Sequence, residues 1–283
     1  MTFTQKLLKL DRRWIYLMVA ICIIVPVIVT FRVPIQVTPE TKGVYDKIES
    51  LPKDSTILLS LDYDPSSMPE LYPMTLAILD HIFTLNRDKG RGLKVVAVTL
   101  WPTGPGLGVS AFAAMEDKFG TNLVKRGRDY AFLGYIPGGY AVVIGLGQDL
   151  KRISPTDYWG TPTSQEPIFE HLNSIRDVAY MVELAAGATV ETWITYGSKP
   201  YGFPMGAGVT AVSAAGYYPY YNSKQITGLM GGLKGAAEYE KLANVQGNAV
   251  PGMRAQALLH FVLVIVVIVV NVLFIVERSK GGK

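Results

Sequence analysis

The chain has 283 residues, of which 18% are charged and 49% are hydrophobic, and its formal net charge is +4. A disordered chain carries fewer apolar residues than this, and an ordinary soluble enzyme carries more charge, so part of the apolar content must face lipid. The length leaves room for one ordinary domain besides any membrane segments.

Two long apolar segments lie near the ends of the chain. Trp14–Phe31 and Ala257–Val276 contain 18 and 20 residues without Asp, Glu, Lys or Arg. About 20 apolar residues in a helix cross the hydrocarbon core of a bilayer, so we expect both segments to be transmembrane helices. A cleaved signal peptide is the alternative for the first segment. Its apolar stretch is long, however, and residues 31–34 offer no small-residue cleavage site.

The charges outside these segments predict the orientation in the membrane. Residues 1–13 carry a formal charge of +3 and residues 277–283 carry +2, which leaves −1 for the rest. Short basic tails stay in the cytoplasm, so we expect a two-pass protein of the cell membrane with both termini inside. The expected segments are a cytoplasmic tail (1–13), transmembrane helix (14–31), extended stalk (32–43), extracytoplasmic domain (44–256), transmembrane helix (257–276) and cytoplasmic tail (277–283).

The domain itself has no excess of basic residues, so its composition predicts no nucleic-acid partner. The single cysteine, Cys22, falls in the first apolar segment. The exported domain therefore needs no disulfide bond.

Apolar runs and amphipathic stretches alternate along the domain. The runs, which predict strands buried on both faces, are 55–61, 93–100, 130–133, 141–146, 178–184 and 208–215. The expected helices are 44–51, 68–86, 109–119, 167–177 and 226–243. This alternation predicts an α/β fold with an open, mostly parallel sheet flanked by helices, a three-layer and Rossmann-like arrangement.

Two carboxylates, Asp62 and Asp64, follow the first expected strand. The carboxyl edge of an open α/β sheet is where ligands bind, and two such carboxylates could hold a divalent cation or act as acid and base. The alternative is that Asp-x-Asp-Pro turns the chain and caps the next helix. We favour the turn, because no histidine, cysteine or third carboxylate obviously completes a site.

A segment rich in glycine and proline, Trp101–Gly108, follows the second expected strand. Its residues Thr103, Gly104 and Gly106 could present backbone N–H groups to an anion. The segment matches neither the P-loop nor the dinucleotide fingerprint, and proline removes two donors. We therefore predict no nucleotide or other cofactor.

Catalytic motifs are not evident. The three histidines (His81, His171 and His260) lack the spacing of metal ligands, and no serine sits in G-x-S-x-G. Catalysis by an unrecognised set of residues stays open.

Tyrosine and glycine concentrate near the end of the domain. Six of the 16 tyrosines lie between Tyr196 and Tyr221, in what we expect to be a long loop. This loop either packs on its own domain or forms an intermolecular surface, with Tyr217, Tyr218, Tyr220 and Tyr221 as the interface candidates.

Four glycines, Gly228, Gly231, Gly232 and Gly235, lie in the last expected helix. Each costs about 1 kcal/mol relative to alanine in a helix, so something must approach closely there. Packing onto the sheet is the favoured interpretation, and a partner helix is the alternative.

The second apolar segment contains Asn271, whose amide is costly in lipid without a partner. We expect a hydrogen bond to another helix, and His260 nearer the outer surface could make one as well.

These features predict a membrane-anchored, non-catalytic subunit of a larger membrane assembly. Its partners would be the lipid bilayer and either other membrane protein subunits or further copies of itself, with the exported domain as scaffold or docking surface. An anchor at each end of an α/β domain is similar in layout alone to auxiliary subunits of bacterial membrane complexes. The alternative is a domain that binds a small ligand or a divalent metal, or an unrecognised hydrolase, at the edge around Asp62 and Asp64.

Overall fold

The computed structural model describes residues 11–29 and 33–281. The chain divides into two compact units. One is Ile35–Ala249, and the other consists of the terminal segments Met1–Pro34 and Val250–Lys283.

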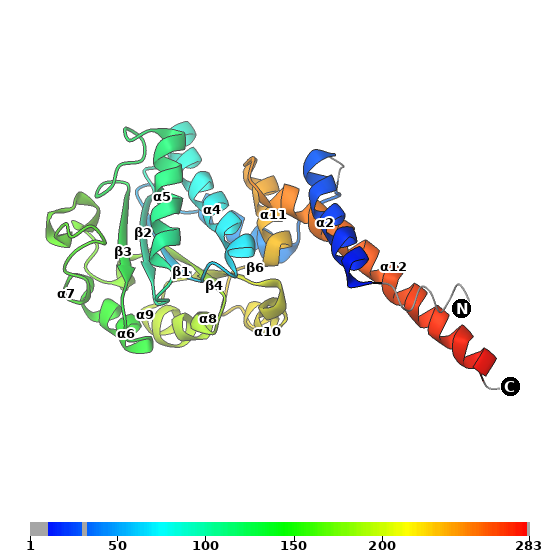
Figure 1. Cartoon of the computed structure of the whole chain (residues 1–283). Coiled ribbons are helices and arrows are strands. Elements are labelled where there is room, and N and C mark those ends of the chain that lie inside the picture. The colour runs from blue at the N-terminus through cyan, green and yellow to red at the C-terminus, as the bar shows by residue number, and fades with distance from the viewer. Residues whose placement is uncertain (1–10, 30–32, 282–283) are drawn as a thin grey trace. The chain divides into compact units, whose positions relative to one another are not determined.

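The unit Ile35–Ala249 is built on a six-stranded parallel sheet in the order β3-β2-β1-β4-β5-β6 (Figure 1). The strands are β1 (Thr56–Asp62), β2 (Lys94–Thr99), β3 (Tyr130–Tyr135), β4 (Tyr180–Ala185), β5 (Met205–Val209) and β6 (Leu229–Gly231). The predicted α/β fold with a parallel sheet is confirmed. The strand order reverses between β1 and β4, and in open α/β sheets such a switch point lies beside the usual ligand crevice.

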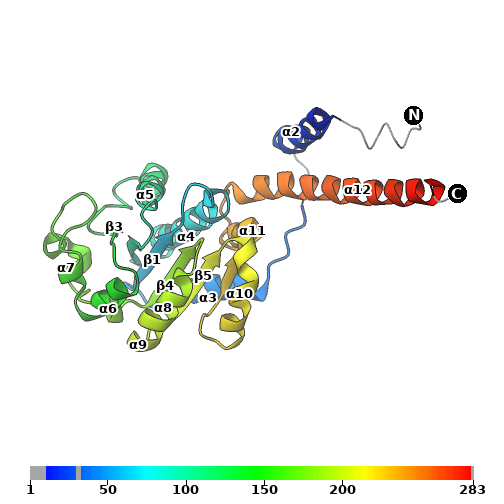
Figure 2. The same cartoon turned by 60° about the horizontal axis from the view of Figure 1, so that its bottom comes forward.

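Helices cover both faces of the sheet (Figures 1 and 2). One face carries α3 (Pro39–Glu49), α4 (Met68–Lys89), α5 (Pro105–Phe119) and α11 (Gly232–Ala243). The other carries α6 (Tyr140–Gln148), α8 (Thr189–Trp193) and α10 (Ala211–Asn222). From the switch point the strand order runs β1, β2, β3 toward one edge of the sheet and β4, β5, β6 toward the other. Right-handed crossovers therefore place α4, between β1 and β2, and α8, between β4 and β5, on opposite faces.

Short helical turns fill the remaining connections. They are α7 (Leu150–Ile153), α9 (Lys199–Tyr201), the 3₁₀ turns η1 (Thr163–Gln165), η2 (Pro167–Phe169) and η3 (Ile175–Asp177), and the π-helical turn η4 (Ile194–Ser198). All six residues of β4 are buried, as expected for a strand covered on both faces.

Two expected elements are wrong in type. Residues 141–146 lie in α6 and do not form a strand, because a short apolar run without periodicity is equally typical of a buried helix. Residues 167–177, expected as one helix, form the separate turns η2 and η3. The expected stalk is also shorter, because Thr38 caps α3 and Pro39 occupies its first turn.

The stretch Tyr196–Tyr221 is not a long loop, since it contains β5 and α10. The strand expected at 208–215 is wrong at its end, because β5 stops at Val209 and α10 begins at Ala211. The helix expected at 226–243 is split into β6 and α11. Gly232, at a φ of +58°, turns the chain directly from one to the other.

The terminal unit contributes α12 (Ala249–Gly281) and α2 (Arg12–Ile28). Among the described residues one helix is long and apolar enough to cross a membrane, over Ala249–Val276, where an 18-residue stretch has a mean hydropathy of 3.2. α2 has 17 residues, and the last residues of the expected span 14–31 lie outside the described ones, as do residues 1–10.

Candidate functional site

The switch point holds a pair of buried acids. Asp62 ends β1 and Glu183 lies in β4, where it is in register with Ser60, and both acids are fully buried. Asp62 Oδ1 accepts hydrogen bonds from the Leu100 N–H at 2.6 Å and the Thr99 hydroxyl at 3.2 Å. Its Oδ2 accepts one from the Ser60 hydroxyl at 2.9 Å. These donors stabilise Asp62 as a carboxylate.

Glu183 has a different environment. Its Oε1 accepts a hydrogen bond from the Thr189 hydroxyl at 2.7 Å, whereas no donor among the described residues reaches Oε2. Burial raises the pKa of Glu183 well above its ordinary value, and the neighbouring Asp62 carboxylate, to which it is hydrogen bonded, raises it further. Burial also raises the pKa of Asp62, but the hydrogen bonds that Asp62 accepts oppose this. We infer that Glu183 is protonated and donates to Asp62.

Two tryptophan side chains, Trp193 and Trp101, pack at this part of the switch point. The Trp193 indole donates to Ser60 Oγ at 3.1 Å. A Cβ placed on Gly187, after β4, would lie 3.0 Å from the Trp101 ring, so that ring packs directly on the backbone. Among the described residues no group of three or more histidine, cysteine or acidic residues could hold a metal ion. The arrangement therefore provides a buried hydrogen-bond network centred on Asp62.

Asp64 is not part of this network. It is partly exposed and its Oδ1 accepts from the N–H groups of Ser66 at 2.9 Å and Ser67 at 3.1 Å. The hydrogen bonds from the two serines lower its pKa. The structure thus places Asp62 in the core and Asp64 in the turn before α4, and does not bring them together as one site.

The glycine-rich segment packs onto the sheet. Gly104 is buried against Thr99 and the carbonyl of Leu61, and its N–H donates to the Trp101 carbonyl at 3.0 Å. Thr103 and Gly106 are exposed on either side of it. The N–H of Gly104 is therefore already used within the segment.

The tyrosine cluster has mixed exposure. Tyr217 is buried, and the single hydrogen of its hydroxyl has two acceptors within reach, the Gly187 carbonyl at 3.1 Å and Glu191 at 2.8 Å. Tyr220 and Tyr221 are half-buried against the core beneath α10, whereas Tyr218 is 44% exposed. Of the four interface candidates, Tyr218 is the one whose side chain is mainly on the surface.

The four glycines make close contacts within their own unit. A Cβ on Gly228 would collide with the backbone of α3 at Val44 and Glu40, and one on Gly235 would meet the Met230 backbone at 2.9 Å. Gly231 and Gly232 face Ala214 and Ala211 of α10 in the same way. Intramolecular packing thus accounts for these glycines.

Asn271 and His260 of α12 are exposed in the described structure. Asn271 donates its amide to the Val267 carbonyl at 2.7 Å. This hydrogen bond lies within α12. It gives the Asn271 amide one of the partners that the sequence analysis expects from another helix.

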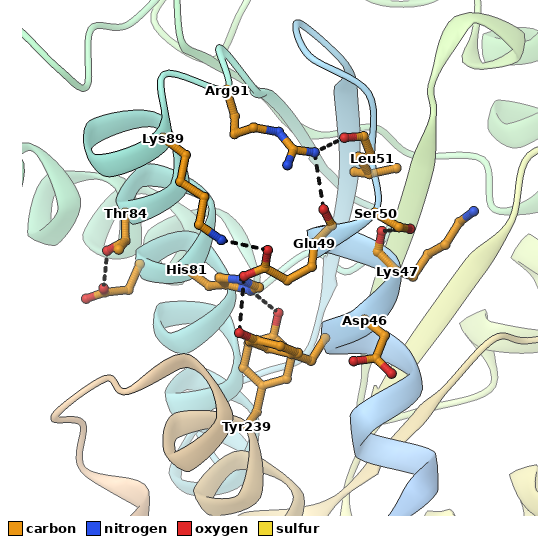
Figure 3. Close-up of polar contacts among 12 residues, drawn as sticks. Asp46, Lys47, Glu49, Ser50, Leu51, His81, Thr84, Lys89, Arg91 and Tyr239 are labelled. Atoms are coloured by element: carbon orange, nitrogen blue, oxygen red, sulfur yellow. Dashed lines mark hydrogen bonds and ion pairs between the residues drawn. The ribbon is translucent and has the colours of Figure 1, made fainter.

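A second polar cluster joins α3, α4 and α11 on the face of the sheet that these helices cover (Figure 3). His81 of α4 is 3% exposed, and its Nδ1 lies 2.9 Å from the Tyr239 hydroxyl of α11. Its Nε2 lies 3.3 Å from Glu49 Oε1 of α3. Tyr45 stacks on the imidazole at 4.5 Å and donates to the same Glu49 oxygen, and Lys89 pairs with the other. Tyr239 is fully buried, so this cluster joins α3, α4 and α11 and does not present a nucleophile.

An open cavity of about 450 Å³ lies at the carboxyl end of β3. Tyr135 and Tyr158, both exposed, line it together with Pro105, Pro137 and Pro155. Asp157, a buried acid that pairs with Arg126, also lines it, and a second buried acid, Glu166, neighbours Asp157.

Sequence reasoning missed Glu183, His81 and the pair Asp157 and Glu166. For Glu183 a signal exists, because it is the one acid inside the apolar run 178–184. A charged residue in a strand buried on both faces needs a partner. His81 and the second acid pair carry no such local signal, because their partners lie far away in sequence or in irregular segments.

No family model, curated protein or solved structure matches this chain.

Proposed function

We propose that this chain is a membrane-anchored, non-catalytic subunit of a larger membrane assembly, and that its α/β unit serves as a docking surface. The observation that carries the proposal is the closure of the switch point. The acids at the usual ligand crevice, Asp62 and Glu183, are fully buried and bonded to the protein's own donors. Such an arrangement supports a stable scaffold more than it supports catalysis.

The membrane attachment rests on α12 and on the charges at both ends. The apolar part of α12 is long enough to span, and α2 contributes a second charge-free stretch from Trp14 onward. Basic residues flank both helices on their outer sides, which favours cytoplasmic termini and an extracytoplasmic α/β unit.

The outer face of α10 is the surface best suited to docking. It carries no charge from Ala211 to Asn222, and Val212 is 90% exposed. Its exposed residues are Ala211, Val212, Ala215, Gly216, Tyr218, Pro219 and Asn222. Small and apolar side chains on a helix face allow close approach of an uncharged surface, so the partner would be another subunit that presents such a surface.

Ligand binding is the second candidate function, and the cavity at the carboxyl end of β3 favours it. A cavity lined by tyrosine and proline suits an uncharged, flat ligand group. A ligand bound there would raise the melting temperature without any partner chain.

The experiment that tests the docking role is extraction of the full-length chain in mild detergent, followed by sizing and mass spectrometry of co-purifying chains. We expect Val212→Asp to remove the partner, because it places a charge on the uncharged face at its most exposed apolar side chain. An aspartate in the first turn of a helix is favourable, so α10 should stay folded. Leu123→Asp, at a 39% exposed position outside α10, is the matched control and should leave the complex intact.

A monodisperse monomer without partners in every mild detergent would overturn the docking role, as would a complex that survives Val212→Asp. The buried Tyr217 is unsuitable for this test, because its loss would also remove the hydrogen bond that its hydroxyl donates inside the domain.

A further inference from the structure

The loop that precedes η1 presents two exposed aromatic side chains and is folded around a buried acid. We call residues 154–163 the aromatic loop, after Tyr158 and Trp159, which are 47% and 41% exposed. Asp157 within it is 4% exposed, and Glu166, just after it, is 6% exposed.

The shape of the loop depends on the Asp157 side chain. Asp157 Oδ1 accepts hydrogen bonds from the N–H groups of Trp159 at 3.0 Å and Thr161 at 2.7 Å. The Asp157 N–H in turn donates to the Thr161 carbonyl at 2.8 Å, which closes the turn. Tyr158 N–H donates to the Phe132 carbonyl of β3 at 2.7 Å, so the turn is held against the edge of the sheet.

A second buried acid, Glu166, neighbours Asp157. No donor among the described residues hydrogen bonds to Asp157 Oδ2 or to Glu166 Oε2. The nearest cation is Arg126, whose Nη1 lies 3.5 Å from Asp157 Oδ2 and whose side chain is 37% exposed. Two buried carboxylates in contact, facing one half-exposed guanidinium, cannot both be ionised without a large cost. One proton between them removes that cost.

We propose that the aromatic loop is operated by a proton on Glu166: the loop is held closed while Glu166 is protonated beside Asp157, and it loosens when Glu166 loses that proton. The Arg126 guanidinium lies over the Trp159 ring at 4.7 Å, so a change at the pair reaches the exposed aromatic surface directly. The inference goes beyond the docking role and does not depend on it, because the loop responds whether or not a partner is present.

The groups around Asp157 and Glu166 set the pH at which the loop loosens. Burial is the main cause that raises the pKa of Glu166, to about 7; the Asp157 charge and hydrogen bond raise it as well, while Arg126 opposes them. Tyr130 of β3 also faces Arg126 and Asp157, and it donates to Glu116 of α5 at 2.8 Å. Burial and Glu116 raise the pKa of Tyr130, so this tyrosine stays neutral and Glu166 is the group that titrates near neutral pH.

Opening of the loop would change what the α/β unit displays. Tyr158 lines the cavity at the end of β3, and Asp157 lies beside it in the wall. Loss of the turn around Asp157 therefore alters both the cavity and the aromatic surface. A group whose pKa is raised in the folded state stabilises that state at low pH, so the closed loop belongs to the acidic side of the transition.

The test is amide hydrogen exchange of the full-length protein in detergent, measured by mass spectrometry from pH 5.5 to 8.5 and corrected for the intrinsic exchange rate. We expect peptides covering 156–163 to exchange at least about tenfold faster at pH 8.5 than at pH 6, since 8.5 lies more than one unit above the transition. Peptides from β1 and β4 should show no such step near pH 7.

Glu166→Gln should remove the transition and keep the loop protected at all these pH values, because glutamine copies the protonated acid. Glu170→Gln, at an exposed position four residues later, is the control and should behave like the wild type. Arg126→Gln should raise the midpoint by roughly one pH unit, because it removes the cation that favours ionisation. Arg126→Gln keeps both acids, so the direction in which its midpoint shifts tests the proposal even if Glu166→Gln fails to fold.

Three results would each overturn the proposal. They are protection of 156–163 that is the same at pH 6 and pH 8.5 in the wild type, a wild-type transition that persists in Glu166→Gln, and a midpoint that stays or falls in Arg126→Gln.

Discussion

Asp62 and Glu183 are neighbouring buried acids on either side of the boundary between β1 and β4, and because the donors around Asp62 favour its carboxylate we place the proton of the pair on Glu183. In an open α/β sheet this boundary is where a ligand usually binds. Here a neutral acid hydrogen bonded to a carboxylate lies beside the boundary, with the Trp193 indole linked to it through Ser60. The pair joins the two halves of the sheet.

The protonation state of the pair predicts how it responds to substitution. Glu183→Gln should change the free energy of unfolding by less than about 1 kcal/mol, because a glutamine amide can donate to Asp62 as the protonated acid does. Asp62→Ala should cost about 3 kcal/mol or more, since it leaves Leu100, Thr99 and Ser60 without their acceptor. Urea unfolding followed by near-UV circular dichroism measures both. Equal losses in the two variants would contradict the assigned proton.

Glu183 also predicts a loss of stability toward alkaline pH. Its pKa is raised in the folded protein, mainly by burial, so its contribution is present at acidic pH and is lost as the pH rises through the folded value. We expect the melting temperature to fall from pH 7.5 toward pH 9, and Glu183→Gln to reduce that slope. Glu166 acts in the same direction, so the comparison is best made in the Glu166→Gln background. A slope unchanged by Glu183→Gln would contradict the prediction.

The sequence predicts the buried strands of the sheet better than it predicts the elements near the end of the α/β unit. The apolar runs at 55–61, 93–100 and 178–184 correspond to β1, β2 and β4, because strands buried on both faces leave a continuous apolar signal. The three-residue strand β6 is too short for any periodicity, and the chain passes from it straight into α11 at Gly232. Its place in the sheet is set by pairing with β5, which only the folded chain shows.

The candidate site is predictable only in part. Asp62 stands out because it ends an apolar run at the carboxyl edge. Its partner Glu183 lies 121 positions later, and pairing between strands sets that contact, not local pattern. The spacing that suggested a pair with Asp64 is misleading. Residues i and i+2 share a face only within a strand, and Asp64 already lies beyond the end of β1. Likewise the structural role of His81 depends on its contacts with Glu49 and Tyr239, which lie in other helices and which the local sequence does not reveal.

His81 predicts the opposite pH response on the acidic side. Burial lowers its pKa, although the hydrogen bond and charge of Glu49 work against this. A lowered pKa means that the stabilisation is present above the ordinary value of 6.5 and is lost as the pH falls below it. The expected loss is about 1.4 kcal/mol for each unit by which the pKa is lowered.

Thermal unfolding between pH 7.5 and pH 5 measures this effect. The wild type should lose stability across the interval from the charging of His81, and His81→Gln should lose less. His171→Gln replaces an exposed histidine and is the matched control, which should follow the wild type. If the two variants respond alike, the buried cluster between α3, α4 and α11 is not the source of the acid sensitivity.

The last prediction concerns the proposed membrane topology of the two terminal helices. Cysteines introduced singly at Lys6, Lys42 and Lys280, after Cys22→Ala, report which side of the membrane each position occupies. Lys42 is an exposed residue of α3, and its surface ion pair with Asp46 contributes about 0–1 kcal/mol, so its loss should be tolerated. With two spans and basic tails inside, a membrane-impermeant thiol reagent on intact cells should label position 42 and spare positions 6 and 280. Labelling of 6 together with 42 would show that α12 alone crosses, because the N-terminal tail would then lie on the side of the α/β unit. Labelling of 280 with 42 protected would instead reverse the orientation.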